Sequence, residues 1–230
     1  ASDEINMIIN DTTNPSNPAI IVNNGDSSTN STAVTLALSA TDNVGITAYY
    51  ASENNSTPAS NASGWNSVTS SASYSDNVSF SLASTGSAGT FSKTVYIWFK
   101  DATGNVSSYS SDAINLVVTD TTAPASPSIS INSGADNTTS TDVTLTLSAT
   151  DSEGVTGYYA SESSTAPANN ASGWTSVTST TSYSDNVSFS FSNVSSFGTD
   201  SRTVYVWYKD NAGNISLSAS GVIALIKKVV

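Results

Sequence analysis

Apolar and polar residues alternate with a period of two along most of this chain, and no helical period lasts beyond a few residues. Val34, Leu36 and Leu38 each stand between polar or small neighbours, and residues 78–82 and 95–99 repeat the pattern. Gly, Pro, Asn and Asp residues separate these runs. Short β-type runs divided by turn residues are typical of an antiparallel β-sandwich.

Seven strands are expected in the first half of the chain. Their predicted ranges are Ala19–Val22, Ala33–Ala40, Ile46–Ser52, Trp65–Val68, Tyr74–Leu82, Thr94–Lys100 and Ile114–Thr119. Seven is the strand count of an immunoglobulin-like or fibronectin-III-like sandwich. The pattern therefore predicts the all-β fold class.

The whole pattern returns 109 residues further along the chain without a slip in register. The residues TVYIWFKD (94–101), for example, return as TVYVWYKD (203–210). A long internal repeat indicates an array of similar units, and each repeat is long enough to close its own core. We expect an N-terminal strand at 1–10, an Ig-like repeat at 11–119 and a second Ig-like repeat at 120–230.

The amino-acid composition argues against several classes of function. The chain has 6 basic and 18 acidic residues, a net charge of −12. Nucleic acid and anionic membranes attract basic patches, so neither is an expected partner, whereas a cation is. No apolar run is long enough to cross a bilayer as a helix. With no Cys and no His, disulfides, zinc-finger sites and a Ser-His-Asp triad are excluded, and we expect a protein that is not an enzyme.

Acidic residues are expected to gather at one end of each sandwich, where the leading segment meets two strand-connecting loops. The predicted sets are Asp11, Asp42 and Asp101 in the first repeat, and Asp120, Asp151 and Asp210 in the second. Crowded carboxylates repel one another, and Ca²⁺ takes six to eight oxygen ligands, so a calcium site is predicted in each repeat. The alternative is turn chemistry, in which Asp and Asn side chains bind nearby backbone N–H groups without a metal.

Aromatic residues form a candidate interaction face. If the regularly spaced apolar residues of the sixth strand point into the core, Tyr96 and Trp98 turn to the outer face, as do Tyr205 and Trp207 in the second repeat. Exposed aromatic strips contact other proteins or stack on sugar rings. Two alternatives are that the faces are exchanged, or that the rings cover a second, smaller core under the Asn54–Gly64 loop.

Asn-x-Ser/Thr triplets are abundant in this Ser/Thr/Asn-rich chain. Candidate glycosylation sites are Asn30, Asn61, Asn77, Asn137, Asn170 and Asn186.

The segment before the first repeat has the sequence of a closing strand. Residues INMIIN (5–10) align with INLVVT (114–119), and both run directly into Asp-Thr-Thr. The residues predicted to drive polymerisation on this segment are Ile5, Met7, Ile8 and Ile9. An unpaired apolar strand is an aggregation hazard, so we expect it to pair with something.

Three pairings are open for that segment. It is donated to a neighbouring molecule and builds a homopolymer, it belongs to a preceding domain of a longer chain, or it adds to an edge of its own first repeat. The expected acceptor is the second repeat, because Lys227 stands where Val118 points inward in the first.

The motifs DTTAP (120–124), LSATD (147–151) and KDNAGN (209–214) resemble the bacterial Ig-like repeat domains of large surface proteins and adhesins. This resemblance covers nearly the whole chain and implies an extracellular or cell-surface location and a role as spacer or presenter; some such repeats are stiffened by calcium. The expected function is the structural subunit of a surface filament that polymerises by N-terminal strand donation. The alternative is a spacer or adhesin segment of a larger surface protein that binds glycans.

Overall fold

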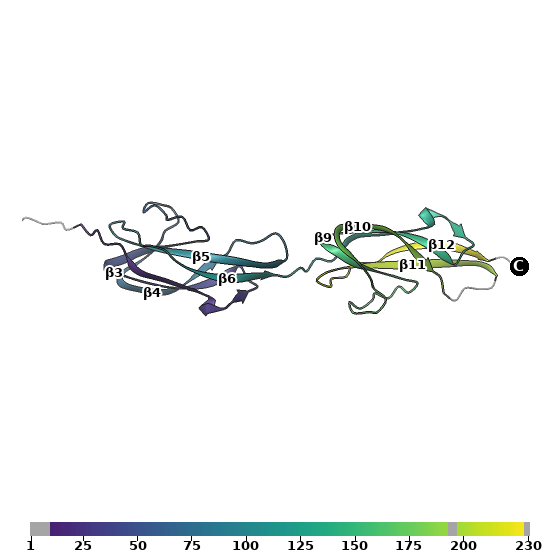
Figure 1. Cartoon of the computed structure of the whole chain (residues 1–230), viewed down its shortest axis with the longest axis horizontal. Coiled ribbons are helices and arrows are strands. Elements are labelled where there is room, and N and C mark those ends of the chain that lie inside the picture. Colours follow the sequence, from purple (N-terminus) through teal and green to yellow (C-terminus); the bar gives the residue numbers. More distant parts are fainter. Residues whose placement is uncertain (1–9, 193–196, 228–230) are drawn as a thin grey trace, which may run out of the picture. The chain divides into compact units, whose positions relative to one another are not determined.

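The computed structural model describes residues 10–192 and 197–227. The chain divides into two compact units, Ala1–Val118 and Thr119–Val230, both of which are built from strands (Figure 1). Among the described residues, no helix is long and apolar enough to cross a membrane.

The described residues of unit one, 10–118, form six strands and one short 3-10 helix. In chain order these are β1 (Ser16–Val22), η1 (Asn23–Gly25), β2 (Ser28–Thr29), β3 (Ala33–Ser52), β4 (Asn66–Ser81), β5 (Gly89–Asp101) and β6 (Ser110–Val118). Unit two repeats the order. Its elements are β7 (Ala125–Ile131), η2 (Asn132–Gly134), β8 (Asn137–Thr138), β9 (Asp142–Ser161), β10 (Thr175–Ser190), β11 (Gly198–Asp210) and β12 (Ala219–Lys227).

The long strands β3 and β4 form an antiparallel hairpin that bends from one layer of unit one into the other. The register between them breaks between Thr41 and Ile46, which marks the bend. The first half of β3 pairs with β1, as in Ile20↔Leu38, and its second half pairs with β5. The hairpin therefore supplies strands to both layers.

One layer consists of β1, the first half of β3 and the second half of β4. The other consists of the first half of β4, the second half of β3, β5 and β6, with β2 parallel to β6. This is the strand order of an immunoglobulin-like sandwich of the fibronectin-III-like kind, so the predicted fold class is confirmed. The second to fifth predicted strands are halves of two continuous strands, because the pairing of β3 with β4 resumes beyond the bend.

The hydrophobic core of unit one lies between the two layers. The alternating residues Val34, Leu36 and Leu38 of β3 are buried in it, together with Val95, Ile97 and Phe99 of β5. Their equivalents in unit two form a matching core. The inward face that the alternation predicted is therefore correct in both units.

Candidate functional site

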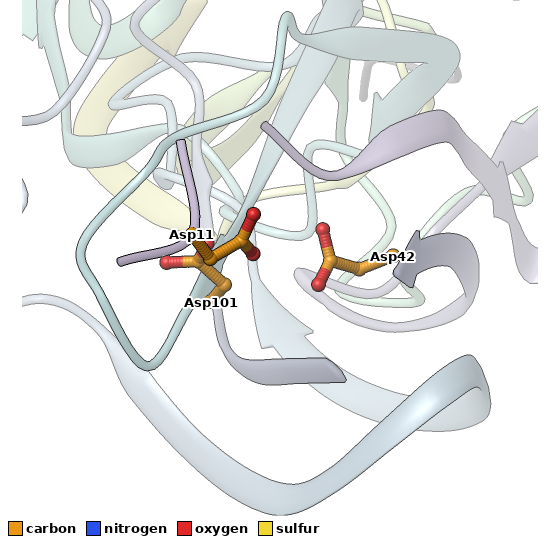
Figure 2. A group of neighbouring side chains, drawn as sticks. All are labelled: Asp11, Asp42 and Asp101. Atoms are coloured by element: carbon orange, nitrogen blue, oxygen red, sulfur yellow. The ribbon is translucent and has the colours of Figure 1, made fainter. Parts of the chain in front are cut away.

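Three aspartates of unit one converge where β3 bends and β5 ends. Asp11, Asp42 and Asp101 each offer a carboxylate oxygen, and these oxygens all lie within 4.8 Å of one another. Figure 2 shows the carboxylate of Asp42 pointing toward the pair formed by Asp11 and Asp101. Asp42 and Asp101 are buried, and Asp11 is partly buried. The structure thus brings together the three acids predicted to gather in this unit.

Asp42 is held by the bend in β3. Its Oδ2 accepts hydrogen bonds from the backbone N–H groups of Val44 (3.0 Å) and Gly45 (2.7 Å). Gly45 has a φ of +135° and lies so close to Ser70 of β4 that a Cβ atom would collide with the serine hydroxyl. Glycine therefore lets both strands bend together, and the bend leaves the second oxygen of Asp42 facing the other acids.

Asp101 is the last residue of β5, and its carboxylate organises the loop that follows. Oδ1 accepts hydrogen bonds from the backbone N–H groups of Thr103 and Asn105, each at 2.9 Å. Oδ2 accepts one from Asn105 Nδ2 at 2.6 Å. The turn chemistry considered as the alternative to a metal is therefore present in this loop.

Asp11 ties the segment before β1 to both loops. Its Oδ1 accepts hydrogen bonds from Thr13 N at 3.0 Å and Asn43 Nδ2 at 3.2 Å. Its main-chain carbonyl accepts from Thr103 Oγ1 and Asn105 Nδ2, both at 3.1 Å. The Thr13 backbone bond, followed by the Asn43 side-chain bond, holds the pKa of Asp11 below its ordinary value of 3.8, so the carboxylate favours its charged form.

Two carboxylate oxygens of this cluster are buried without a partner. Asp11 Oδ2 and Asp42 Oδ1 accept no hydrogen bond from the described residues. The ion pairs of the described residues involve Glu53, Glu162 and Asp200 as the acids, and none of these belongs to the cluster. Buried oxygens without a partner are costly, and repulsion between the carboxylates adds to that cost. In the described residues, hydrogen-bond donors stabilise the cluster, but no basic side chain forms an ion pair with it.

Unit two has the same arrangement around Asp120, Asp151 and Asp210, whose offered oxygens also lie within 4.8 Å of one another. One oxygen of each carboxylate accepts backbone N–H groups of its own turn. The donors are Thr122 for Asp120, Glu153 and Gly154 for Asp151, and Gly213 and Asn214 for Asp210. Asp120 Oδ2 and Asp151 Oδ2 are again buried without a partner. The pattern of bonded and unbonded oxygens is therefore duplicated.

This donor set fits a hard divalent cation. At Asp42 and Asp151 turn capping and metal binding do not compete, because capping occupies one oxygen and leaves the other facing the cluster. Both oxygens of Asp101 and of Asp210 accept hydrogen bonds within their own turns. Carboxylate oxygens are the ligands that Ca²⁺ takes most readily, with main-chain carbonyls and water completing its shell. Three carboxylates carry three negative charges, which a divalent cation would largely offset.

The surface exposure predicted for the tryptophans of the aromatic face is wrong. Trp98 is 0% exposed and Trp207 is 3% exposed, whereas Tyr96 and Tyr205 are partly exposed. The tryptophans do lie on the side of β5 and β11 opposite the main core, but other rings and a loop cover them. The alternative of a second, smaller core is what the structure contains.

The second core of unit one is built around Tyr50. Its ring lies 5.6 Å from Trp65 and 6.1 Å from Trp98, measured between centroids. The 54–64 loop closes over it, with Trp65 Nε1 donating to Ala59 O at 2.9 Å and Lys100 Nζ lying 4.8 Å from the Trp65 ring. In unit two, Tyr159, Trp174, Trp207 and Lys209 repeat this arrangement.

The predicted polymerisation residues Ile5, Met7, Ile8 and Ile9 lie outside the described residues. The predicted acceptor strand is within them. β12 includes Lys227, which pairs with Gly198 of β11, so Lys227 does not prevent this strand from closing its own unit. Both units contain their own closing strand, β6 and β12.

The six candidate glycosylation asparagines are all exposed. They are Asn30, Asn61, Asn77, Asn137, Asn170 and Asn186.

Asp112, an acid that bridges strands β1 and β6, was not among the residues that the sequence predicted to matter. Asp112 of β6 accepts a hydrogen bond from Val22 N of β1 at 2.8 Å. The equivalent residue in unit two is Gly221. An alignment of the two repeats would have revealed this difference, because a glycine in unit two stands where unit one has an acid.

No family model matches the sequence, and no curated protein sequence matches it. Among solved structures, the chain is similar to the fibronectin(III)-like modules of Clostridium thermocellum CbhA, with 9% identity over 91% of this chain and 94% of that chain and a TM-score of 0.28. It is also similar to red sea bream transglutaminase, with 10% identity, a TM-score of 0.28, and coverage of 92% of this chain but 31% of that one. At such scores neither likeness bears on function, and the fold assignment rests on the strand order.

Proposed function

We propose that this chain is an extracellular, non-enzymatic structural protein in which Ca²⁺ fastens each repeat to the segment that leads into it. The observation that carries the proposal is the repeated cluster. In each unit one acid from the leading segment, Asp11 or Asp120, meets two buried acids of long strands, and buried oxygens remain without a partner. A bound cation would hold the leading segment and both loops together.

Calcium would also shorten the tether between the two repeats. Strand β6 ends at Val118, and Asp120 stands two residues later, so Thr119 alone separates the strand from an anchored residue. Pro124 then restricts its own φ and the conformation of the residue before it. A tether with so few free dihedral angles suits a protein that serves as a spacer or fibre subunit.

Assembly into a surface filament by strand donation is the finer part of this proposal. Residues 5–10 carry the alternation of residues 114–119, most of which lie in β6, a strand that pairs with β5 from Ser110 to Val118. The segment therefore has the sequence of a strand that pairs within this fold.

A spacer or adhesin segment that binds glycans is the weaker candidate. Burial of Trp98 and Trp207 removes two of the four tryptophan rings from the surface on which a sugar would stack.

Thermal unfolding in calcium and in chelator tests the calcium proposal. A ligand at about 100 times its Kd stabilises the folded state by about 2.7 kcal/mol, which raises the Tm of a domain of this size by several degrees. We expect this rise with Ca²⁺ and a smaller one with Mg²⁺, which demands stricter octahedral geometry. Identical melting curves in calcium and in excess chelator would contradict the proposal.

A further inference from the structure

The two units differ at the seam between their first and last long strands. In unit one the Asp112 carboxylate of β6 accepts a hydrogen bond from Val22 N of β1 and so bridges the seam. Gly221 replaces that acid in unit two, where Ile131 replaces Val22. The glycine has no side chain with which to bridge β12 and β7.

A groove of about 380 Å³ lies along the unbridged seam. Ile129, Ile131, Gly221, Val222 and Ile223 are among its lining residues. Ile129 is only partly buried, whereas its counterpart in unit one, Ile20, is buried. The side chain of Val222 is 62% exposed. The groove thus has isoleucines of both strands in its lining and an exposed apolar side chain at its rim. The polar residues Ser130, Asp136 and Ser201 also line it.

Strand edges form both walls of the groove. In the described part of unit two, β7 pairs with β9, and β12 pairs with β11 and, at Ala224 and Leu225, with β8. The N–H of Ala224 donates to Asp136 O, on the side of β12 away from β11. Backbone groups two residues apart face the same side of a strand, so the N–H and C=O of Val222 and Ser220 face the groove. These groups offer main-chain pairing to a further strand.

We propose that this groove of unit two accepts residues 4–10 of a second copy of the chain as an added β-strand. The inference rests on the proposed assembly by strand donation and names its acceptor. Residues Ile5, Met7 and Ile9 align with Ile114, Leu116 and Val118, of which the first two are 2% and 1% exposed in the core of unit one. A strand with apolar side chains on one face and polar or exposed side chains on the other matches a groove that has both isoleucines and polar residues in its lining and strand edges as its walls.

The bridge in unit one explains why the second unit is the acceptor. The Asp112 carboxylate stands in the unit-one seam and already satisfies Val22 N, so a strand inserted there would have to break that bond. Unit two presents no such side chain at Gly221. The donor therefore discriminates between two otherwise similar units through one pair of positions.

The test transfers the bridge of unit one into unit two. In the full chain, Gly221→Asp combined with Ile131→Val reproduces the Asp112–Val22 pair. Assembly is followed by sedimentation and negative-stain microscopy, with deletion of residues 1–10 as the reference for lost donation. We expect the double variant to weaken assembly at least about tenfold, as the deletion does, with an unchanged circular dichroism spectrum. The matched control, Asp112→Gly in unit one, should not weaken assembly.

The outcomes distinguish a failure of the groove proposal from a failure of the proposed function. If assembly is lost on deletion of residues 1–10 but unaffected by the double variant, the groove is not the acceptor, and strand donation itself still holds. Assembly that survives the deletion, or the absence of any assembly, overturns both.

Disulfide trapping gives a second readout that does not depend on the folding of the double variant. The chain contains no Cys, so Val222→Cys paired with Asn6→Cys, or with Ile8→Cys, introduces two thiols only. A strand in the groove would bring one of these pairs within the Cβ separation of about 3.5–4.5 Å that a disulfide needs. A crosslinked ladder on a non-reducing gel supports the proposal. Ladders that are equally strong when Val222→Cys is replaced by Ala113→Cys, the equivalent position of unit one, would overturn it.

Discussion

Each aspartate at the bend of a long strand divides its two oxygens between two roles. Asp42 and Asp151 cap their own turns through one oxygen and leave the other buried without a partner. The capped oxygen accounts for the local fold. A bound cation would give the other oxygen a partner and so account for its burial.

Asp42→Asn should abolish the calcium response of unit one while raising the stability of that unit in chelator. The amide keeps a carbonyl oxygen for the Val44 and Gly45 N–H groups, and its NH₂ donates toward the remaining carboxylates in place of a repelling charge. We expect a gain of about 1 kcal/mol without metal. Denaturant unfolding in calcium and in chelator measures both effects.

Asp26→Asn is the control for that variant, because it removes the same charge at an exposed position outside the cluster. If Asp42→Asn and Asp26→Asn respond to calcium alike, the cluster is not the site.

The buried tyrosine hydroxyls predict a loss of stability at high pH. Burial raises the pKa of Tyr74 and of Tyr183 from the ordinary 10.0 to about 12, with smaller contributions from nearby Asp76 and Asp185. The unfolded chain ionises these groups near pH 10, whereas the folded chain holds the protons until about pH 12. Their contribution to the free energy of unfolding is therefore complete below pH 10 and is lost as the pH rises from about 10 to about 12.

Tyr74→Phe should reduce this loss and raise stability at neutral pH, because the Tyr74 hydroxyl is buried without a partner. Denaturant midpoints at pH 8, 10 and 11.5 measure it. Tyr109→Phe is the control, since that ring is 50% exposed. Parallel pH curves for wild type and Tyr74→Phe would contradict the assignment.

Among the elements, the bent hairpin of β3 and β4 shows how far sequence patterns reach. The alternation in Val34, Leu36 and Leu38 predicted their burial because side chains on a strand alternate between faces. The Asp42–Gly45 segment has the composition of a turn, yet β3 continues through it and its pairing with β4 resumes at Ile46. Turn residues mark a change of direction, and the pairing partner decides whether the strand also ends.

The burial of Trp98 could not be predicted from the period-two pattern, for a different reason. Alternation correctly placed it on the face opposite Phe99, but exposure depends on what covers that face. The cover comes from Tyr50, Trp65 and the 54–64 loop, which are distant in sequence. Likewise, the positions of the acids predicted the cluster, whereas their unpartnered oxygens emerge from the three-dimensional arrangement.

Trp98→Ala should destabilise isolated unit one by about 3–5 kcal/mol, the usual cost of emptying the site of a buried tryptophan. Tyr96→Ala should cost less because that side chain is partly exposed. Denaturant unfolding compares the two. Equal stabilities for wild type and Trp98→Ala would restore the view that this ring serves an interaction with another molecule.

At the scale of the whole molecule, the number of acidic clusters in the described residues follows the number of repeats. Each repeat supplies two buried acids, and the segment leading into it supplies the third, so two repeats make two clusters, each a proposed cation site. Further repeats of this kind would each add one cluster and one short tether, so an array could lengthen by repeating the same fold.

Calcium stoichiometry tests the central claim most directly. Isothermal titration of the metal-stripped chain should give two Ca²⁺ per chain. Asp42→Asn and Asp151→Asn should each reduce the count to one, and the double variant should bind none. Absence of binding at millimolar Ca²⁺, or two sites that persist in the double variant, would contradict the account.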